Sequence, residues 1–157
     1  GEQYDMPGRN VRLTEMNALL GRVQLSHLDE YLARRRQLAA RYTERLSRLN
    51  SLALVAPAAL ENSSFWKFPV LLPPGCDRAE VTRRLSDAGI AADWAYQPAL
   101  HLQPVFRKLF GTAEGMLPRS EAILSRHLCL PCHPGLTDGD VDYVCEILAV
   151  TLRALES

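Results

Sequence analysis

Residues 4–42 read YDMPGRNVRLTEMNALLGRVQLSHLDEYLARRRQLAARY, and the rest of the chain is organised around this stretch. Apolar residues recur there at three- and four-residue steps and continue to Leu49, which indicates an amphipathic helix. Thr14 suits the N-cap of that helix. A helix over residues 14–50 would be about 55 Å long, so we expect it to bend or break. The run Arg34-Arg35-Arg36 is expected to form a solvated face.

The polar turn ahead of the helix is a candidate anion site. Asn10 and Arg12 stand two residues apart, and a guanidinium carries a fork of donors that fits phosphate or carboxylate oxygens. A helix N-terminus next to them favours an anion as well. The alternative interpretation is local: Arg12 pairs with Glu15, and Asn10 caps a turn.

Alternating apolar residues, proline and glycine divide the remainder into short elements. Pro69 lies inside the strongest strand signal, SFWKFPVLL, which favours an edge strand or a bulge there. We expect strands at residues 51–57, 64–72, 90–96 and 127–131, and helices at about residues 77–89, 105–110, 118–126 and 137–155. The order predicts an α/β fold in which helices pack on one face of a small mixed sheet.

Composition excludes several classes of protein. The 157 residues carry 18 basic and 18 acidic side chains, so no basic excess points to nucleic acid or to an acidic membrane surface. No apolar run is long enough to span a bilayer, and no signal peptide is visible. We expect a cytoplasmic protein of one domain, and the mid-chain character of the first residues indicates a fragment.

Two of the cysteines match a haem-attachment motif, but the other sequence features that accompany such a motif are missing. Cys129-Leu130-Pro131-Cys132-His133 fits the C-x-x-C-H pattern of covalent haem attachment, and the two thiols could also serve zinc or redox chemistry. No export signal and no second ligand pair accompany them. We expect both cysteines to be reduced, metal-free, small hydrophobic side chains.

Three separated motifs stand out in the sequence. The first is carried by Gly8, Asn10, Arg12, Thr14, Glu15, Ala18, Gly21, Gln24, Leu25, Leu28, Asp29, Glu30, Arg35, Ala39 and Tyr42. The second and third motifs occupy residues 89–104, with the pattern Y-x-P-x-x-H-x-Q-P, and residues 128–144, with L-x-LP-x-HP-x-LT. Together the three motifs resemble the DegT/DnrJ/EryC1/StrS family of pyridoxal-phosphate (PLP)-dependent sugar aminotransferases.

The resemblance implies a domain and a reaction. Residues 1–157 would be the C-terminal small domain of a fold-type I enzyme that transfers an amino group from glutamate or glutamine to a keto-sugar nucleotide or a related cyclic ketone. The family implies a homodimer in which Asn10 and Arg12 reach the cofactor phosphate of the neighbouring subunit. The segment with Tyr96, His101 and Gln103 would approach the sugar-nucleotide pocket, although a histidine in a proline-rich loop can also be a plain surface residue.

The chemistry that an aminotransferase needs is missing from this stretch. Such enzymes bind PLP covalently through a lysine, and neither Lys67 nor Lys108 stands in the family's lysine motif. The large domain that carries that lysine is therefore absent here, and we expect the isolated chain to be inactive. The alternative is a stand-alone, non-catalytic remnant that binds a partner protein or a metabolite.

Overall fold

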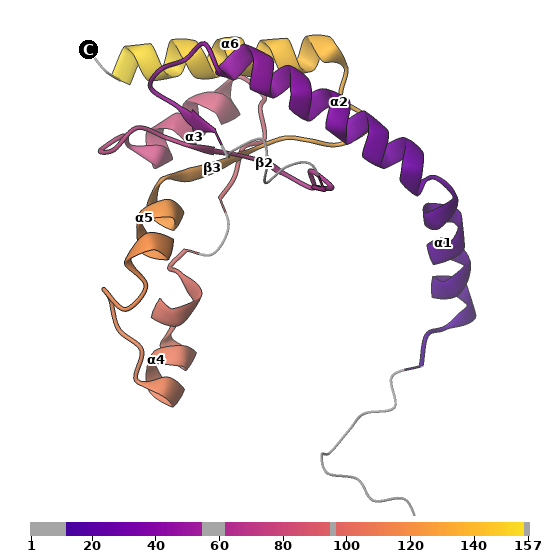
Figure 1. The fold of residues 1–157 in the computed structure, drawn as a ribbon, viewed down its shortest axis with the longest axis horizontal. Coiled ribbons are helices and arrows are strands. Elements are labelled where there is room, and N and C mark those ends of the chain that lie inside the picture. The colour runs from indigo at the N-terminus through magenta and orange to yellow at the C-terminus, as the bar shows by residue number, and fades with distance from the viewer. Residues whose placement is uncertain (1–11, 55–61, 95–96, 156–157) are drawn as a thin grey trace, which may run out of the picture.

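The structure, a computed structural model, describes residues 12–54, 62–94 and 97–155. Figure 1 shows the helices α2 and α6 lying along one side of a small sheet, and two helical arms extending from the other side. The elements run in the order α1 (Glu15–Ser26), α2 (Leu28–Leu46), β1 (Ala53–Leu54), β2 (Phe68–Leu71), α3 (Arg78–Asp87), η2 (Leu100–Leu102), α4 (Pro104–Phe110), α5 (Pro118–Arg126), β3 (His127–Leu130) and α6 (Asp138–Leu155). The predicted α/β fold class is confirmed.

The expected break in the first helix occurs at His27. Its φ of −105° and ψ of 2° leave the helical region, and its N–H bonds back to the carbonyls of Gln24 and Leu25. Thr14 is the N-cap of α1, as expected, and accepts a hydrogen bond from the N–H of Asn17 at 3.3 Å. The second half of the predicted stripe packs into the core through α2, whereas α1 buries no residue within the described chain.

The sheet has the strand order β1-β2-β3, and both pairings are antiparallel, so the prediction of a mixed sheet was wrong. No described strand returns through a helical crossover to a parallel neighbour. Of the strand expected at 90–96, the described part, residues 90–94, joins the sheet through one bridge, between Asp93 and Cys129 on the outer side of β3.

Pro69 lies in the central strand, and the register of residues 68–71 against residues 127–130 is continuous, so the prediction of an edge strand or a bulge was wrong. It stands opposite Cys129, whose N–H and C=O both bond to Asp93 on the far side, at 2.7 and 3.2 Å. The pairing with β3 therefore takes no hydrogen bond from position 69. On the other side of β2, the described pairs with β1 are Ala53 with Leu71 and Leu54 with Val70, the residue after the proline. A residue without an N–H is tolerated where the ladder requires no donor from it, as here toward β3.

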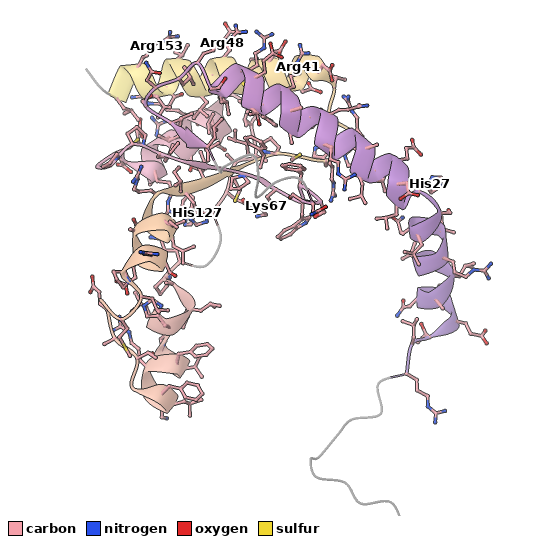
Figure 2. The ribbon with its side chains drawn as sticks, in the orientation of Figure 1. His27, Arg41, Arg48, Lys67, His127 and Arg153 are labelled. Atoms are coloured by element: carbon pink, nitrogen blue, oxygen red, sulfur yellow. The ribbon has the colours of Figure 1, made fainter. Side chains whose placement is uncertain are left out.

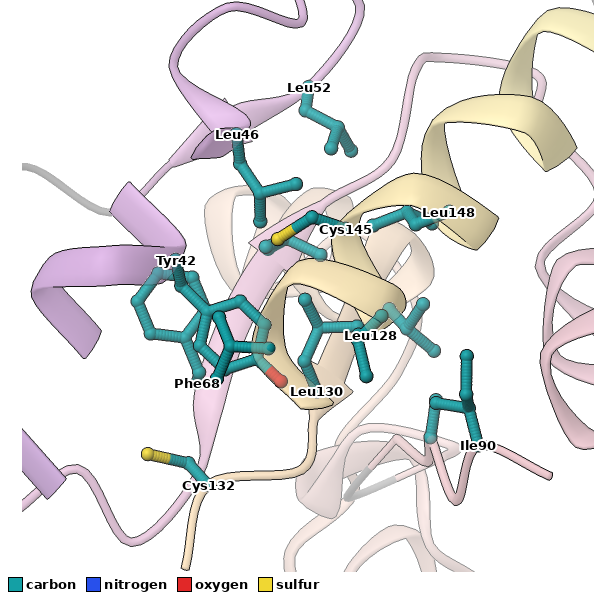
Figure 3. Close-up of a cluster of buried hydrophobic side chains, with 14 of the residues drawn as sticks. Tyr42, Leu46, Leu52, Phe68, Ile90, Leu128, Leu130, Cys132, Cys145 and Leu148 are labelled. Carbon is teal, nitrogen blue, oxygen red and sulfur yellow. The ribbon is translucent and has the colours of Figure 1, made fainter. Parts of the chain in front are cut away.

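The core lies between the sheet and the layer of α2, α3 and α6 (Figure 3). Tyr42 of α2 stacks on Phe68 of β2 at 4.8 Å between ring centroids, and its hydroxyl donates to the carbonyl of Pro131 at 3.0 Å. Burial removes water from this hydroxyl and raises its pKa. Leu148 of α6 closes the core from above the sheet, with no exposed surface.

The helix caps were readable from sequence. Asp77 accepts hydrogen bonds from the N–H groups of Ala79 and Glu80 at the start of α3. At the start of α6, the Asp140 carboxylate accepts from the N–H of Thr137, whose hydroxyl oxygen accepts from the N–H of Asp140. These bonds satisfy amides that have no partner within their helix.

The arginine run is not a uniformly solvated face, because Arg34 binds across to the other end of the chain. Its guanidinium donates to the carbonyl of Leu136 at 2.6 Å and lies 3.0 Å from the Asp138 carboxylate. Two further arginines of α2, Arg41 and Arg45, donate to both oxygens of Asp142. These ion pairs fix α2 against α6.

We expect Asp142→Asn to lower the melting temperature of the chain at pH 7. Hydrogen bonds from Arg41 and Arg45 hold the pKa of the Asp142 carboxyl well below its ordinary value. A carboxyl with a lowered pKa in the folded state stabilises the fold above its unfolded pKa of about 3.9 and loses that contribution as the pH falls through the folded pKa. The difference between wild type and variant should therefore shrink below about pH 4. Thermal unfolding followed by circular dichroism from pH 2 to pH 8 measures it.

The matched control is Glu146→Gln, one turn further along α6, where the side chain is exposed. It removes the same charge and should leave the melting temperature nearly unchanged. An Asp142→Asn effect that is the same at pH 3 and pH 7 would contradict the assigned role of the ion pairs.

Cys129 and Cys132 are buried, unpaired thiols, and burial raises the pKa of each. A raised pKa disfavours the thiolate that metal binding and redox chemistry require. In the part of the chain that the structure describes, no group of three His, Cys, Asp or Glu side chains is arranged to hold a metal ion. Over the same ranges, no helix combines the length and the apolar character needed to cross a membrane.

Candidate functional site

Two helical arms carry the described residues of the predicted site. Figure 1 shows α1 on one arm and α4 with α5 on the other, both on the side of the sheet away from α6. Arg12 precedes α1, and His101 and Gln103 belong to the other arm. The chain therefore brings His101 and Gln103 together and leaves Arg12 on a separate arm. Asn10 and Tyr96 lie outside the described residues.

Arg12 stands two residues before the N-cap of α1 and is exposed to solvent. The first turn of a helix carries N–H groups without intrahelical partners, and its dipole attracts anions. An exposed guanidinium beside such a turn has the chemistry of a phosphate or carboxylate contact. Arg12 therefore lies ahead of the N-terminus of α1, and its role in anion binding stays a prediction.

His101 is held in place by a carboxylate that sequence reasoning missed. Its Nε2 lies 2.9 Å from Oε1 of Glu121 in α5, and the two side chains are only 10% and 19% exposed. Since the carboxylate accepts this hydrogen bond, the proton of a neutral ring lies on Nε2 and Nδ1 is left as an acceptor. His101 is therefore a positioned side chain and not a plain surface histidine.

Glu121 ties together three segments of this arm. Besides His101, it accepts hydrogen bonds from the N–H of Gly115 at 3.0 Å and of Leu117 at 3.1 Å. The bond from Gly115, followed by that from His101, lowers the pKa of its carboxyl. The only signal in the sequence is an acidic residue three positions after Pro118, where first-turn acids are common.

A cavity of about 230 Å³ opens beside this pair. The Gln103 side chain donates from Nε2 to the carbonyl of Pro98 at 3.0 Å, which fixes the loop that forms one wall. Its lining combines apolar side chains with a few polar ones, as is usual in ligand pockets. The lining residues are Gln97, Pro98, Ala99, Leu102, Glu114, Glu121, Leu124 and Ser125.

A second polar group lies on the sheet itself. The ammonium of Lys67 contacts both oxygens of Asp93, at 2.8 and 2.6 Å. Figure 2 shows Lys67 on the side of the sheet between the two arms. Sequence reasoning assigned no role to Asp93, because residues 67 and 93 belong to different predicted strands.

Comparison with known proteins gives one consistent result. The model of the DegT/DnrJ/EryC1/StrS aminotransferase family matches residues 2–149. Among curated relatives, the chain is 36% identical to a pleiotropic regulatory protein of Geobacillus stearothermophilus, over 93% of this chain and 39% of that protein. It is 32% identical to GDP-perosamine synthase of Caulobacter vibrioides, over 92% of this chain and 39% of that protein.

Solved structures agree with these matches. The aminotransferase TlmJ of Streptoalloteichus hindustanus superposes with a TM-score of 0.83 at 33% identity, over 98% of this chain and 40% of that one. DesV of S. venezuelae, solved with a ketimine intermediate, superposes with a TM-score of 0.82 at 31% identity, over 99% and 40%. This chain thus spans about two-fifths of the length of the relatives it matches.

Proposed function

We propose, on the premise that this chain belongs to the DegT/DnrJ/EryC1/StrS aminotransferase family, that it is the C-terminal small domain of a PLP-dependent sugar aminotransferase. The full-length protein would be a cytoplasmic homodimer that moves an amino group from glutamate or glutamine to a keto-sugar nucleotide or a related cyclic ketone. The observation that carries the proposal is the family match, which extends over residues 2–149.

The names of the relatives support a sugar substrate. Besides GDP-perosamine synthase, the chain is 34% identical to a dTDP-4-dehydro-2,3,6-trideoxy-D-glucose 4-aminotransferase of Saccharopolyspora spinosa, over 88% of this chain and 34% of that protein. Each name belongs to a protein that acts on a nucleotide-linked sugar. For the present chain we infer the same class of substrate and leave the individual sugar open.

The described residues fit the part of the cofactor that they would touch. Arg12, exposed ahead of the N-terminus of α1, would bind the PLP phosphate of the neighbouring subunit together with Asn10. When bound, PLP supplies an electron sink for the amino transfer. Both lysines of this chain lie elsewhere, so the covalent attachment belongs to the large domain.

His101, Gln103 and Tyr96 would form the sugar side of the site. Because Glu121 holds the Nε2 side of the ring, Nδ1 of His101 can accept a hydrogen bond from a sugar hydroxyl. Gln103 fixes the Pro98 loop of the cavity wall. These residues bind and orient the substrate.

The exposed apolar face of α1 supports a larger assembly. Leu20, Val23 and neighbouring apolar side chains of the predicted stripe are exposed in this chain. A contiguous apolar face marks a surface that another protein segment covers. In the full-length enzyme we expect Leu20, Val23 and Leu28 to be buried.

The experiment that tests the proposal uses the full-length protein. It should bind PLP with a visible absorbance band and convert a nucleotide-linked keto-hexose into the amino sugar with glutamate or glutamine as donor. Mass spectrometry of the product identifies the transfer. A purified full-length protein that binds PLP but transfers no amino group to any such ketone would refute the proposed reaction.

Arg12→Ala in the full-length protein should weaken PLP binding by about 10- to 100-fold, because a charge-assisted hydrogen bond to phosphate is lost. Titration of the apoenzyme with PLP, followed by absorbance, measures the dissociation constant. The control is Arg22→Ala, which removes an exposed arginine of α1, the helix that follows Arg12, and should leave PLP binding unchanged. Equal affinities of the Arg12→Ala and wild-type proteins would remove Arg12 from the site.

A further inference from the structure

Trp66, Lys67 and Asp93 form a group that we call the Trp66 cluster. The Lys67 ammonium contacts both carboxylate oxygens of Asp93 and lies 5.1 Å from the centre of the Trp66 ring. Lysine thus joins an aromatic ring to a carboxylate. None of the three residues has a role in the site described above.

The cluster lies on the face of the sheet that α2 and α6 leave open. Phe68 faces the core, where it stacks on Tyr42, so the preceding residue, Lys67, faces the other side. Asp93 joins β3 opposite Cys129, which in turn stands opposite Pro69. Directly opposed residues share one face of a sheet, so Asp93 also belongs to the open face.

Trp66 is exposed to solvent next to a strained backbone position. Phe65, one residue before it, has a φ of +44°, which a non-glycine residue rarely adopts. Phe65 is itself buried near Phe68, with 6.5 Å between the two ring centroids, whereas Trp66 is 67% exposed. A chain that buries one aromatic residue through a strained turn and leaves the next one in water has a surface suited to contact with a ligand.

The chemistry of the cluster fits a hexose ring. An indole face packs against the apolar C–H face of a sugar, and a carboxylate accepts hydrogen bonds from its hydroxyls. Asp93 keeps acceptor capacity, since Lys67 makes one contact to each oxygen and an ionised carboxylate offers about four lone-pair directions.

The cluster is within reach of a ligand in the cavity on the neighbouring arm. Gln97 lines that cavity and follows Asp93 by four residues. Four residues span at most about 14 Å even when fully extended. One sugar nucleotide can therefore touch both the cavity and the open face of the sheet.

We propose that the Trp66 cluster is a sugar-binding subsite that contributes to substrate specificity. Trp66 stacks on the hexose, and Asp93, held by Lys67, accepts hydrogen bonds from the hydroxyls of the hexose. This inference deepens the proposed function and rests on it. In this arrangement the open face of the sheet contacts the sugar, whereas Arg12 binds the cofactor phosphate.

The test uses the full-length enzyme with three variants, Trp66→Ala, Trp66→Phe and Asp93→Asn. Trp66→Ala and Asp93→Asn should raise the KM for the keto-sugar nucleotide by about 10-fold or more, because stacking and charged hydrogen bonds are each lost. Trp66→Phe should recover part of the loss. The KM for the amino donor and the rate of its half-reaction should stay at the wild-type values.

Asp87→Asn is the matched control for Asp93→Asn. Asp87 lies on α3, is 64% exposed on its side chain against 62% for Asp93, and likewise pairs with a cation, Arg83, at 2.6 Å. It should leave all kinetic constants unchanged. Calorimetric titration with the amino-sugar nucleotide product gives a second readout, in which Trp66→Ala and Asp93→Asn should bind at least about 10-fold more weakly.

Two failures are distinguishable. If wild-type enzyme binds no sugar nucleotide, the proposed function itself fails. If the wild type binds and the Trp66→Ala and Asp93→Asn proteins bind equally well, the subsite is refuted while the proposed function stands. Equal losses for the sugar and for the amino donor would also refute the subsite, since they would show a structural role.

Discussion

The isolated 157-residue chain, mixed with PLP, an amino donor and a nucleotide-linked keto-hexose, is expected to show no turnover and no specific covalent attachment of the cofactor. Its two lysines are Lys67 and Lys108. Lys67 is held in an ion pair by Asp93, and Lys108 is an exposed residue of α4. Neither is a desolvated amine of the kind that forms a Schiff base.

Borohydride reduction followed by peptide mass mapping measures attachment, and product analysis measures turnover. The full-length protein under the same conditions is the positive control. Stoichiometric labelling of Lys67 or Lys108 together with turnover would contradict this expectation. An inactive isolated chain beside an active full-length protein would favour the enzyme over a stand-alone remnant that binds a partner protein or a metabolite.

Leu148→Ala should destabilise the chain by about 2–5 kcal/mol, the usual range for a leucine truncated in a closed core. Leu148 is 0% exposed and belongs to the buried core cluster, so its truncation is expected to leave a cavity. For a chain of this length the melting temperature should fall by about 4–20 °C. Urea unfolding, followed by circular dichroism, gives the free energy directly.

Val150→Ala is the control, since it removes apolar carbons from an exposed position of the same helix. Its effect on the free energy of unfolding should be within about 0.5 kcal/mol. Comparable losses in the two variants would show that the face of α6 assigned to the core is wrong.

The sequence was sufficient for the elements that short-range patterns define. Steps of three and four residues predicted α1 and α2, and excessive length predicted the break that occurs at His27. Asp77 and Thr137 correctly predicted the starts of α3 and α6, because capping depends on residues within one helical turn. The three motifs led to the family, which the match over residues 2–149 confirms.

Only the tertiary structure decided which distant residues meet. Pro69 was assigned to an edge strand or a bulge because proline lacks an N–H. Its place in the central strand is possible because the N–H and the C=O of Cys129, the residue opposite it, both bond to Asp93 instead. Arg34 was assigned to solvent because no partner stands near it in sequence, whereas Asp138 lies about a hundred residues away.

The same reason separates the predicted from the unpredicted parts of the site. Motif spacing singled out Arg12, His101 and Gln103. It could not show that Glu121 holds His101, or that Lys67 and Asp93 meet on the open face of the sheet. Local patterns record interactions with neighbours one or two turns away. Contacts between residues 20 or more positions apart arise only when burial of the common core fixes the elements against one another.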